Sequence, residues 1–264
     1  MQHRLFKDQL SRTVSIPFPP LRIISLVPSQ TEFLFDLGLD EEIVGITKFC
    51  IHPADRFRMK TKVGGTKKLN LDLIRSLNPD LIIGNKEEND QQQVEALMQD
   101  FPVWMSDISN LEEALTMMEG VGSITGKDLK AREMTTLIRK RFKEFAGLNH
   151  DQPPRVAYMI WKDPLMAAGR DTFISDVLER AGWLNVVEKS RYPELDAEEL
   201  RAYSPDMVFL SSEPYPFKEK HLAEFREICP DSEVQIVDGE MFSWYGSRLL
   251  LVPAYLQTLC AQKG

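Results

Sequence analysis

The sequence predicts an α/β fold of two sandwich lobes joined by one long backbone helix. Apolar runs such as "RIISLV" (22–27) and "DLIIGN" (80–85) do not alternate with polar residues, which is typical of parallel strands covered on both faces. The chain also repeats itself: "LNLDLIRSLNPDLIIGNKEEN" (69–89) and "LDAEELRAYSPDMVFLSSEPY" (195–215) each predict a helix, a Pro-Asp turn, a buried strand and a polar loop. Two Rossmann-like lobes of similar design are the simplest explanation.

Each lobe is expected to contain a series of strands that alternate with helices. In the first lobe the predicted strands are "RIISLV", "EEIVGIT", "DLIIGN" and "PVWMSD", and in the second they are "RVAYMIW", "NVVE", "DMVFLSS" and "EVQIVD". The segment "GRDTFISDVLERAGWLNVV" (169–187) parallels "PSQTEFLFDLGLDEEIVGI" (28–46), since both predict a polar turn followed by a helix. The N-terminal "FKDQLSRTVSIP" predicts a short hairpin.

The turn at residues 28–31 is where the first strand gives way to a helix, and its role is open from sequence. Ser29 and Glu32 have the spacing of a capping box, and Thr31 could cap instead. Ser29 as a nucleophile has no histidine near it in sequence. The turn could also offer backbone N–H groups to an anionic ligand.

The lobes are expected to be joined by a helix rather than by a flexible linker. Residues 126–148 contain no proline and are rich in strong helix formers, whereas flexible linkers are rich in Gly, Ser or Pro. We therefore predict an N-terminal lobe over residues 1–125, a linking helix over 126–149 and a C-terminal lobe over 150–264.

Composition excludes several classes of protein. The net charge of −8 and a pI near 5.2, with no dominant basic stretch, argue against a nucleic-acid partner. The three cysteines are far apart in sequence, so neither a disulfide framework nor a zinc ribbon is indicated. No apolar run is long enough to span a bilayer, and the N-terminus lacks the apolar core of a signal peptide.

Catalytic and metal-binding signatures are weak. The sequence has no nucleophile elbow, P-loop, Rossmann glycine fingerprint or His-Glu-x-x-His motif, so we expect no catalytic residues and no cofactor. Cys50 and His52 lie in a predicted strand-end loop and could jointly meet a transition metal, with Glu87 and Glu88 as further polar groups. A metal site needs three or four converging ligands, and the second lobe offers no histidine partner, so we predict no metal site.

Aromatic residues gather in the loops that follow the predicted strands of the second lobe. In an open parallel sheet, ligands bind beyond the carboxyl ends of the strands. The aromatic residues expected at that edge are Trp161, Tyr192, Tyr215, Phe242, Trp244 and Tyr245. Their concentration in loops that contain Pro and Gly indicates a ligand wall rather than a buried core alone.

Taken together, these segments resemble a known family. "RIISLVPSQTEFLFDLG", "VGGTKKLNLDLIRSLNPDLIIG", the mid-chain helix and "AGRDTFISDVLERAGWLNVV" are similar to the substrate-binding proteins of ABC importers for vitamin B12 and iron–siderophore complexes. The resemblance covers residues 4–262, and the order of the motifs is specific. It implies a large metal chelate held between two lobes, and a long helix that limits the change in lobe angle on binding.

The resemblance also implies particular ligand-binding residues. Phe49 and Tyr192 keep the aromatic character of cleft loops in the cobalamin-binding member, whereas Thr66 and Asn85 replace tryptophans, which argues against cobalamin itself. The loop "MFSWYGSR" is expected to bring Arg248 to the ligand, where it would be available to an acidic group. The predicted ligand-binding set is Ser29, Gln30, Phe49, His52, Thr66, Asn85, Trp161, Tyr192, Trp244, Tyr245 and Arg248.

One acidic residue in each lobe is expected to contact a membrane partner. Asp72 and Glu198 each lie seven residues before the proline of a repeated Pro-Asp turn. A carboxylate in the first turn of a helix also stabilises the helix dipole, which is the alternative explanation. In the resembling family, one acidic residue per lobe at these places docks onto arginines of the two permease subunits.

Two functional hypotheses follow. The first is a non-catalytic, monomeric substrate-binding protein that delivers a corrinoid or ferric siderophore to an ABC permease dimer from the periplasm. The second is an intracellular enzyme or metallochaperone of tetrapyrrole or metal metabolism on the same fold, and the absent signal peptide and the polar cluster around Cys50 favour it. Fold alone does not separate them.

Overall fold

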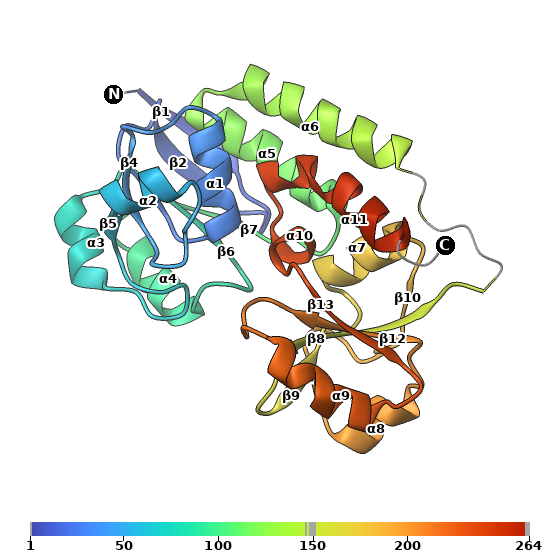
Figure 1. Ribbon diagram of the computed structural model, residues 1–264. Helices are drawn as coiled ribbons and strands as arrows, with labels where there is room; N and C mark the ends of the chain where they lie inside the picture. The colour runs from blue at the N-terminus through green and yellow to red at the C-terminus, as the bar shows by residue number, and fades with distance from the viewer. Residues whose placement is uncertain (1, 146, 148–151, 262–264) are drawn as a thin grey trace. The chain divides into compact units, whose positions relative to one another are not determined.

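The computed structural model describes residues 2–145, 147 and 152–261, which form two compact units. Unit 1 contains Met1–Ile108, Glu112–Arg139 and Tyr245–Leu250, and unit 2 contains Ser109–Leu111, Lys140–Trp244 and Leu251–Gly264. Each unit has its own β-sheet with helices packed around it, which confirms the predicted α/β class (Figure 1).

The sheet of unit 1 is entirely parallel. Its strand order is β5 (Thr61–Lys62), β4 (Ile43–Ile46), β3 (Ile23–Ser25), β6 (Leu81–Asn85) and β7 (Val103–Ser106). Every residue of β3, β6 and β7 is buried, which explains why these strands read as continuous apolar runs. The predicted strands are confirmed, and β5 is an additional short edge strand.

The remaining elements of the N-terminal half surround that sheet. Strands β1 (Gln2–Lys7) and β2 (Thr13–Phe18) form the predicted hairpin, which is antiparallel. The helices are α1 (Pro28–Asp36), α2 (Ala54–Met59), α3 (Leu71–Leu77), α4 (Gln91–Met98), α5 (Leu111–Thr125) and α6 (Asp128–Glu144).

Unit 2 has a mixed sheet. The strand order is β11 (Glu194–Leu195), β9 (Leu165–Ala167), β8 (Arg155–Trp161), β12 (Met207–Ser211) and β13 (Glu233–Val237), and β10 (Leu184–Asn185) also pairs with β8. Strands β8, β12 and β13 are parallel as predicted, and β9 and β11 are antiparallel additions. The parallel strand β10 shares only Asn185 with the predicted strand 185–188. The helices are α7 (Phe173–Arg180), α8 (Ala197–Ala202), α9 (Leu222–Ile228), α10 (Glu240–Ser243) and α11 (Val252–Ala261), and the 3₁₀ turns are η1 (Glu219–His221) and η2 (Ser247–Leu250).

The sequence repeat corresponds to a repeated structural clamp at the Pro-Asp turns. In unit 1 the guanidinium of Arg22 donates to the carbonyl oxygens of Leu77 and Asn78 at the end of α3, and the Asp80 carboxylate accepts from the Arg22 N–H. In unit 2 the equivalent residues, Arg155 and Asp206, make the same contacts at the end of α8. Each arginine therefore satisfies carbonyl groups that a helix end leaves without partners.

Helix α1 begins earlier than the predicted capping box requires. Pro28 occupies its first turn, where a fixed φ and a missing N–H cost nothing, and Val27 is the N-cap without a side-chain hydrogen bond. The prediction that Ser29 and Glu32 form a capping box is therefore wrong. Thr31 does not cap either, because its hydroxyl donates to the carbonyl of Val27 at 2.8 Å inside the helix.

Helix α6 lies beside α5 (Figure 1). The Thr135 hydroxyl donates to the Glu119 carboxylate at 3.1 Å, and a Cβ on Gly122 would lie 2.4 Å from the Cβ of Ala131, so the two helices approach closely. The helix covers most of the predicted range 126–149, of which residues 146, 148 and 149 lie outside the described residues. Its role in linking two domains stays a prediction.

A short segment near the C-terminus, Tyr245–Leu250, belongs to unit 1 although the chain before and after it belongs to unit 2. We call it the strap. Arg248 of the strap forms a two-point ion pair with Glu32 of α1, with N–O distances of 2.6 and 3.0 Å. The Tyr245 hydroxyl donates to the Glu88 carboxylate at 2.7 Å. Gly246 allows the strap to approach α1, since a Cβ there would lie 2.6 Å from the carbonyl oxygen of Ser29.

The Glu32–Arg248 pair is largely buried, with side chains that are 17% and 10% exposed. Burial raises the pKa of Glu32, while Arg248 and His52 oppose that rise. A buried carboxylate that loses its partner is strongly destabilising, because its desolvation is then uncompensated. The pair should therefore hold the strap on α1.

We expect Arg248→Ala to lower the free energy of unfolding by about 3 kcal/mol at pH 8. Because the pKa of Glu32 is raised in the folded state, folded protein takes up a proton more readily than unfolded protein as the pH falls. The loss of unfolding free energy caused by Arg248→Ala should therefore shrink between pH 8 and pH 5. Urea unfolding at these pH values measures the effect. In the control Glu32→Gln/Arg248→Ala the pH dependence should be absent, and an equal loss for Arg248→Ala at every pH would contradict the prediction.

Candidate functional site

The carboxyl ends of the parallel strands of unit 1 form the first candidate site. Strand β3 lies between β4 and β6, so the chain leaves β3 toward one side of the sheet and later returns on the other. Such a switch in strand order leaves a crevice beyond the carboxyl ends, where open α/β sheets bind ligands. The loops after β3, β4, β5 and β6 meet at this edge and hold many of the predicted ligand-binding residues.

Three of the predicted residues at this edge are buried. Ser29, Gln30 and Asn85 are 2%, 0% and 1% exposed. The Gln30 side-chain amide donates to the Ser106 hydroxyl at 2.5 Å. The side-chain oxygen of Asn85 (Oδ1) accepts the backbone N–H groups of Glu87 and Glu88 in the next loop. These side chains organise the loops, and a direct contact with ligand stays a prediction for them.

Phe49, His52 and Thr66 are the more accessible residues of the same edge. The Phe49 side chain is 50% exposed, and Thr66 and His52 are partly exposed. His52 lies close enough to Glu32 to lower the pKa of that carboxyl group. These three residues are therefore in reach of a ligand.

The Cys50 thiol is buried beside two threonine hydroxyls rather than presented to a ligand. The Cys50 thiol is buried and contacts the hydroxyls of Thr31 and Thr47, each at 3.1 Å, and burial raises its pKa to about 11. A thiol must lose its proton to bind a metal, so this environment opposes ligation. Among the residues that the structure describes, no three His, Cys, Asp or Glu side chains are grouped as metal ligands.

The predicted availability of Arg248 is wrong. Its guanidinium already binds the Glu32 carboxylate, so an acidic ligand group would have to displace that carboxylate. Tyr245 is 6% exposed and is bonded to Glu88. The strap thus supports the loops of unit 1, and its contact with ligand stays a prediction.

In unit 2, the accessible aromatic residues lie at the ends of strands. Trp161 ends β8 and is 38% exposed, and its indole N–H donates to the carbonyl of Asp163 at 3.2 Å. Its ring meets Tyr215 edge to face, with centroids 5.5 Å apart. Tyr192 is partly exposed in the loop before β11. A ring held in place at the surface loses little entropy when a ligand packs on it.

Trp244 is buried, whereas a residue of a ligand wall is expected to be exposed to the site. It is 5% exposed, and its indole N–H donates to the Glu213 carboxylate at 2.9 Å. Ser243 donates to the same carboxylate oxygen at 2.6 Å, and burial raises the pKa of Glu213. The sequence could not show this, because Glu213 and Trp244 follow different strands.

The predicted docking residues occupy equivalent places in the two units. Asp72 is the second residue of α3 after the N-cap Asn70, and Glu198 is the second residue of α8 after the N-cap Asp196. Both are exposed. Asp72 lies 3.5 Å from Arg75, whereas Arg201, which occupies the equivalent place in α8, donates to the carbonyl of Ile228.

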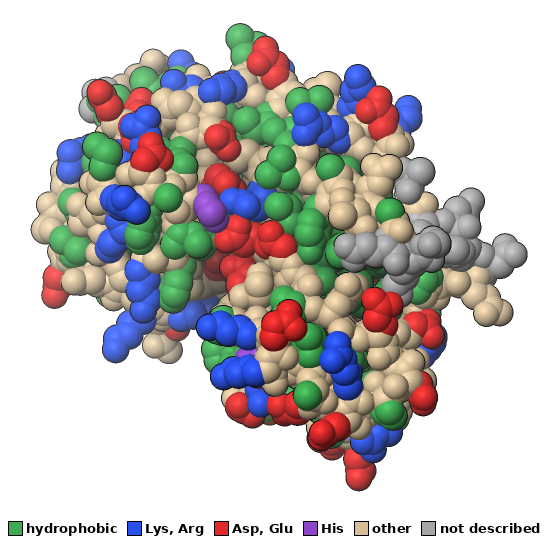
Figure 2. Space-filling model, viewed as in Figure 1, with side chains coloured by type: hydrophobic (Ala, Val, Ile, Leu, Met, Phe, Trp, Pro, Cys, Tyr) green, Lys and Arg blue, Asp and Glu red, His purple; other side chains and the backbone are tan. Residues whose placement is uncertain are grey.

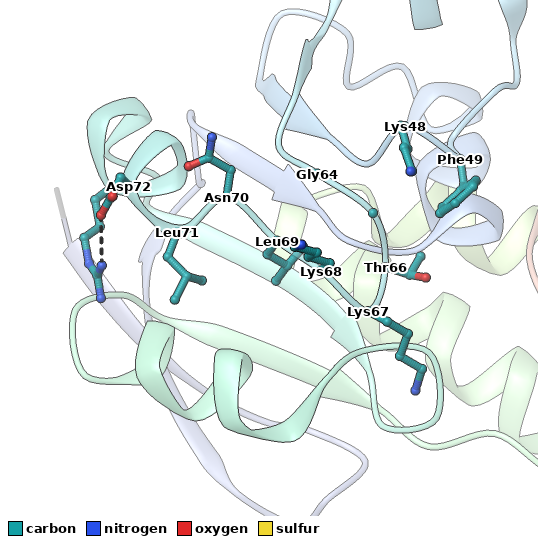
Figure 3. A pocket seen from close by; sticks show the side chains of 12 residues that line it. Lys48, Phe49, Gly64, Thr66, Lys67, Lys68, Leu69, Asn70, Leu71 and Asp72 are labelled. Carbon is teal, nitrogen blue, oxygen red and sulfur yellow. Dashed lines mark ion pairs between the residues drawn. The ribbon is translucent and has the colours of Figure 1, made fainter.

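A groove in unit 1 contains several lysines, which are not among the predicted ligand-binding residues. It has a volume of about 870 Å³ and is lined by Lys48, Phe49, Gly64, Gly65, Thr66, Lys67, Lys68, Leu69, Asn70, Leu71, Asp72 and Arg75. Figure 3 shows Lys48 and Phe49 side by side, facing the loop that carries Thr66 and Lys67. The run "GGTKK" (64–68) is the only sign of this groove in the sequence. It does not predict a basic groove by itself, because Lys48 reaches the same surface from a different loop.

On the face seen in Figure 2, acidic and basic side chains are interspersed. This face has no continuous basic patch of the kind that binds nucleic acids. Within the described residues, no helix combines the length and apolar character needed to cross a bilayer.

Known proteins share this sequence pattern and fold. A family model described as periplasmic binding protein matches residues 23–227. A vitamin B12-binding protein of Vibrio cholerae is 25% identical over 199 residues, which are 74% of this chain and 72% of the relative.

Two solved structures have the same fold. The periplasmic vitamin B12-binding protein of Vibrio cholerae has a TM-score of 0.77 at 23% identity and covers 94% of this chain and 100% of its own. A periplasmic heme-binding protein of Pseudomonas aeruginosa has a TM-score of 0.81 at 22% identity and covers 93% of this chain and 94% of its own. The match over most of the sequence and both units shows that this chain belongs to the periplasmic binding protein family, whose members bind substrates and are not enzymes.

Proposed function

We propose that this protein is the substrate-binding component of an ABC importer and that it carries a metal chelate of the corrinoid, haem or ferric-siderophore type. Family membership is the observation that carries the proposal. Vitamin B12-binding and heme-binding proteins among its relatives support a large, flat ligand. The enzymatic alternative has no support in this family.

The exposed aromatic residues favour such a ligand. Phe49 and Trp161 lie at the carboxyl ends of strands and Tyr192 lies in the loop before β11, and all three are at least partly exposed. Backbone hydrogen bonds of Lys48 and Arg191 hold the loops of Phe49 and Tyr192. Aromatic rings pack well on flat conjugated groups and tolerate differences in their substituents. Thr66 and Asn85, which stand where the cobalamin-binding member has tryptophans, favour a chelate other than cobalamin.

The family's usual working place supports a periplasmic location, which we propose with the cytoplasm as the alternative. We further propose that the protein acts as a monomer and delivers its ligand to a permease dimer. Asp72 and Glu198 are the proposed docking residues, because exposed acids at equivalent helix starts in the two units suit a partner built from two similar subunits.

Native mass spectrometry tests the ligand class directly. The purified protein is incubated with cobalamin, cobinamide, haem and ferric siderophores, and a stable one-to-one adduct with one class is expected. Absence of any adduct, with the same protein folded by circular dichroism, would overturn the chelate proposal.

The accessible aromatic residues should contribute measurably to affinity. We expect Phe49→Ala, Trp161→Ala and Tyr192→Ala each to cost about 1 kcal/mol of binding free energy, roughly fivefold in Kd. Quenching of tryptophan fluorescence measures binding, and Phe6→Ala, which removes an aromatic ring from the N-terminal hairpin, is the control. Unchanged affinity in all three variants would show that the ligand lies elsewhere.

The docking residues should affect transport. The double variant Asp72→Ala/Glu198→Ala is expected to lose most stimulation of the cognate transporter ATPase, and the stimulation by the parent should weaken with salt. Glu198→Ala alone, which leaves the groove of unit 1 intact, is expected to keep its Kd for ligand. Asp128→Ala/Glu219→Ala is a matched control, since it removes one acid from the first turn of a helix in each unit. If the docking variant stimulates as well as the parent, the two carboxylates only stabilise helix dipoles.

A further inference from the structure

The groove of unit 1 is built from two loops at the carboxyl edge of its sheet. The loop after β4 supplies Lys48 and Phe49, and the loop after β5 supplies Lys67 and Lys68 (Figure 3). A Cβ on Gly65 would lie 3.2 Å from the Phe49 ring and 3.3 Å from the Lys48 side chain, so the two loops are in direct contact. Residues separated in sequence thus form one continuous surface.

The second loop has a fixed backbone. The N–H of Gly65 donates to the carbonyl of Lys68 at 2.8 Å, and the N–H of Lys48 donates to the carbonyl of Gly64 at 2.8 Å. Gly64 has a φ of +115°, and a Cβ there would lie 2.5 Å from the Lys68 carbonyl oxygen. Only glycine fits this position.

Side chains at the start of α4 fasten the loop from the other side. The Asn89 amide donates to the carbonyl of Thr66 at 3.2 Å, and the Gln93 amide donates to the carbonyl of Lys67 at 3.0 Å. The Gln93 carbonyl oxygen also accepts the N–H of Leu69 at 2.7 Å. The lysines therefore project from a preorganised frame, which lowers the entropy cost of binding.

The groove is positively charged in a chain whose net charge is −8. Among the residues described, Lys48, Lys67 and Lys68 are exposed and take part in no ion pair, although the Lys67 ammonium donates to the carbonyl of Glu87. Arg75 is neutralised by Asp72 and Asp100, at 3.5 and 2.9 Å. The pKa of Asp90 is lowered by the backbone N–H of Gln93 and further by Lys67, so part of the Lys67 charge is balanced. An excess of lysines clustered in a groove of an acidic protein still favours an anionic ligand.

Phe49 adds an apolar face to this charge. Its ring is 50% exposed, and the Lys48 ammonium lies 4.9 Å from the ring centroid. An exposed ring with an ammonium over one face suits a flat group whose periphery carries carboxylates, because the rest of the ring can make apolar contact while the ammonium pairs with a charge.

We propose that this groove binds the carboxylate-bearing edge of the ligand, so that the substrate is an anionic chelate rather than one whose side chains are all amides. This inference rests on the proposed function and narrows it. Lys48 and Lys67 are the specificity-determining residues, because each stands next to an accessible residue, Phe49 or Thr66, on one of the two contacting loops.

The test uses pairs of ligands that share a ring and a metal but differ in charge. The pairs are cobyrinic acid with its amide counterpart cobinamide, and iron protoporphyrin IX with its dimethyl ester. For the ring system that binds, the acid should bind about tenfold tighter than its neutral partner, and the difference should shrink as salt rises. In Lys48→Gln/Lys67→Gln the acid should lose about tenfold in affinity while the neutral partner changes little.

Lys130→Gln is the control for the loss of a lysine charge outside the groove, because it removes one ammonium from an exposed site on α6 of the same unit. Equal binding of acid and neutral partner, or equal losses for both in Lys48→Gln/Lys67→Gln, would overturn the groove proposal while the chelate function stands. Absence of binding by either ring and by ferric siderophores would overturn the chelate function, and the groove proposal with it. An unchanged urea midpoint shows that the lysine variant is folded.

Discussion

Parallel pairing of fully buried central strands is the constraint on which the rest of this structure depends. Strand β3 pairs with β4 and β6, and β8 pairs with β12, with the pairing extending outward on either side. The backbone groups of such strands have no access to water, so they must bond to a neighbouring strand. Parallel pairing then places the carboxyl ends of the strands of each sheet at one edge, and the candidate loops with Phe49, Thr66 and Trp161 follow strands there.

The clamp at each Pro-Asp turn transmits this constraint to the helices. Arg22 and Arg155 each bind the end of a helix, while Asp80 and Asp206 hold the start of the neighbouring strand. Helices α3 and α8 are therefore fixed in the same way relative to the strands that follow them. This local equivalence explains why the exposed acids near their N-termini occupy matching places in the two units.

Buried carboxylates distinguish residues that support loops from residues that can meet a ligand. Glu32 binds Arg248, and Glu213 binds Trp244. Both partners were predicted to contact ligand, and both make buried contacts that stabilise loops. Each buried carboxylate has a raised pKa because of its burial, and each needs its partner to stay in place. Among the candidate residues that are accessible are Phe49, His52, Thr66, Trp161, Tyr192 and the lysines of the groove.

The sequence by itself determined the features that depend on neighbours along the chain. The central strands, the N-terminal hairpin, the repeat and the acids at the helix starts could all be predicted, because apolar runs and turn residues act over short distances. The early start of α1 at Pro28 and the short strands β5, β9 and β11 were missed, since local pattern competes poorly with sheet pairing over two or three residues.

Only the tertiary structure decided which polar side chains face each other. Arg248 and Glu32 are 216 residues apart in sequence, and Tyr245 and Glu88 are 157 apart, so no local pattern could reveal either pair. The same holds for the groove, where Lys48 meets the loop of Lys67 only because β4 pairs with β5. Burial, partner and net local charge are properties of the packed chain, and they distinguish the buried, ion-paired Arg248 from the exposed lysines of the groove.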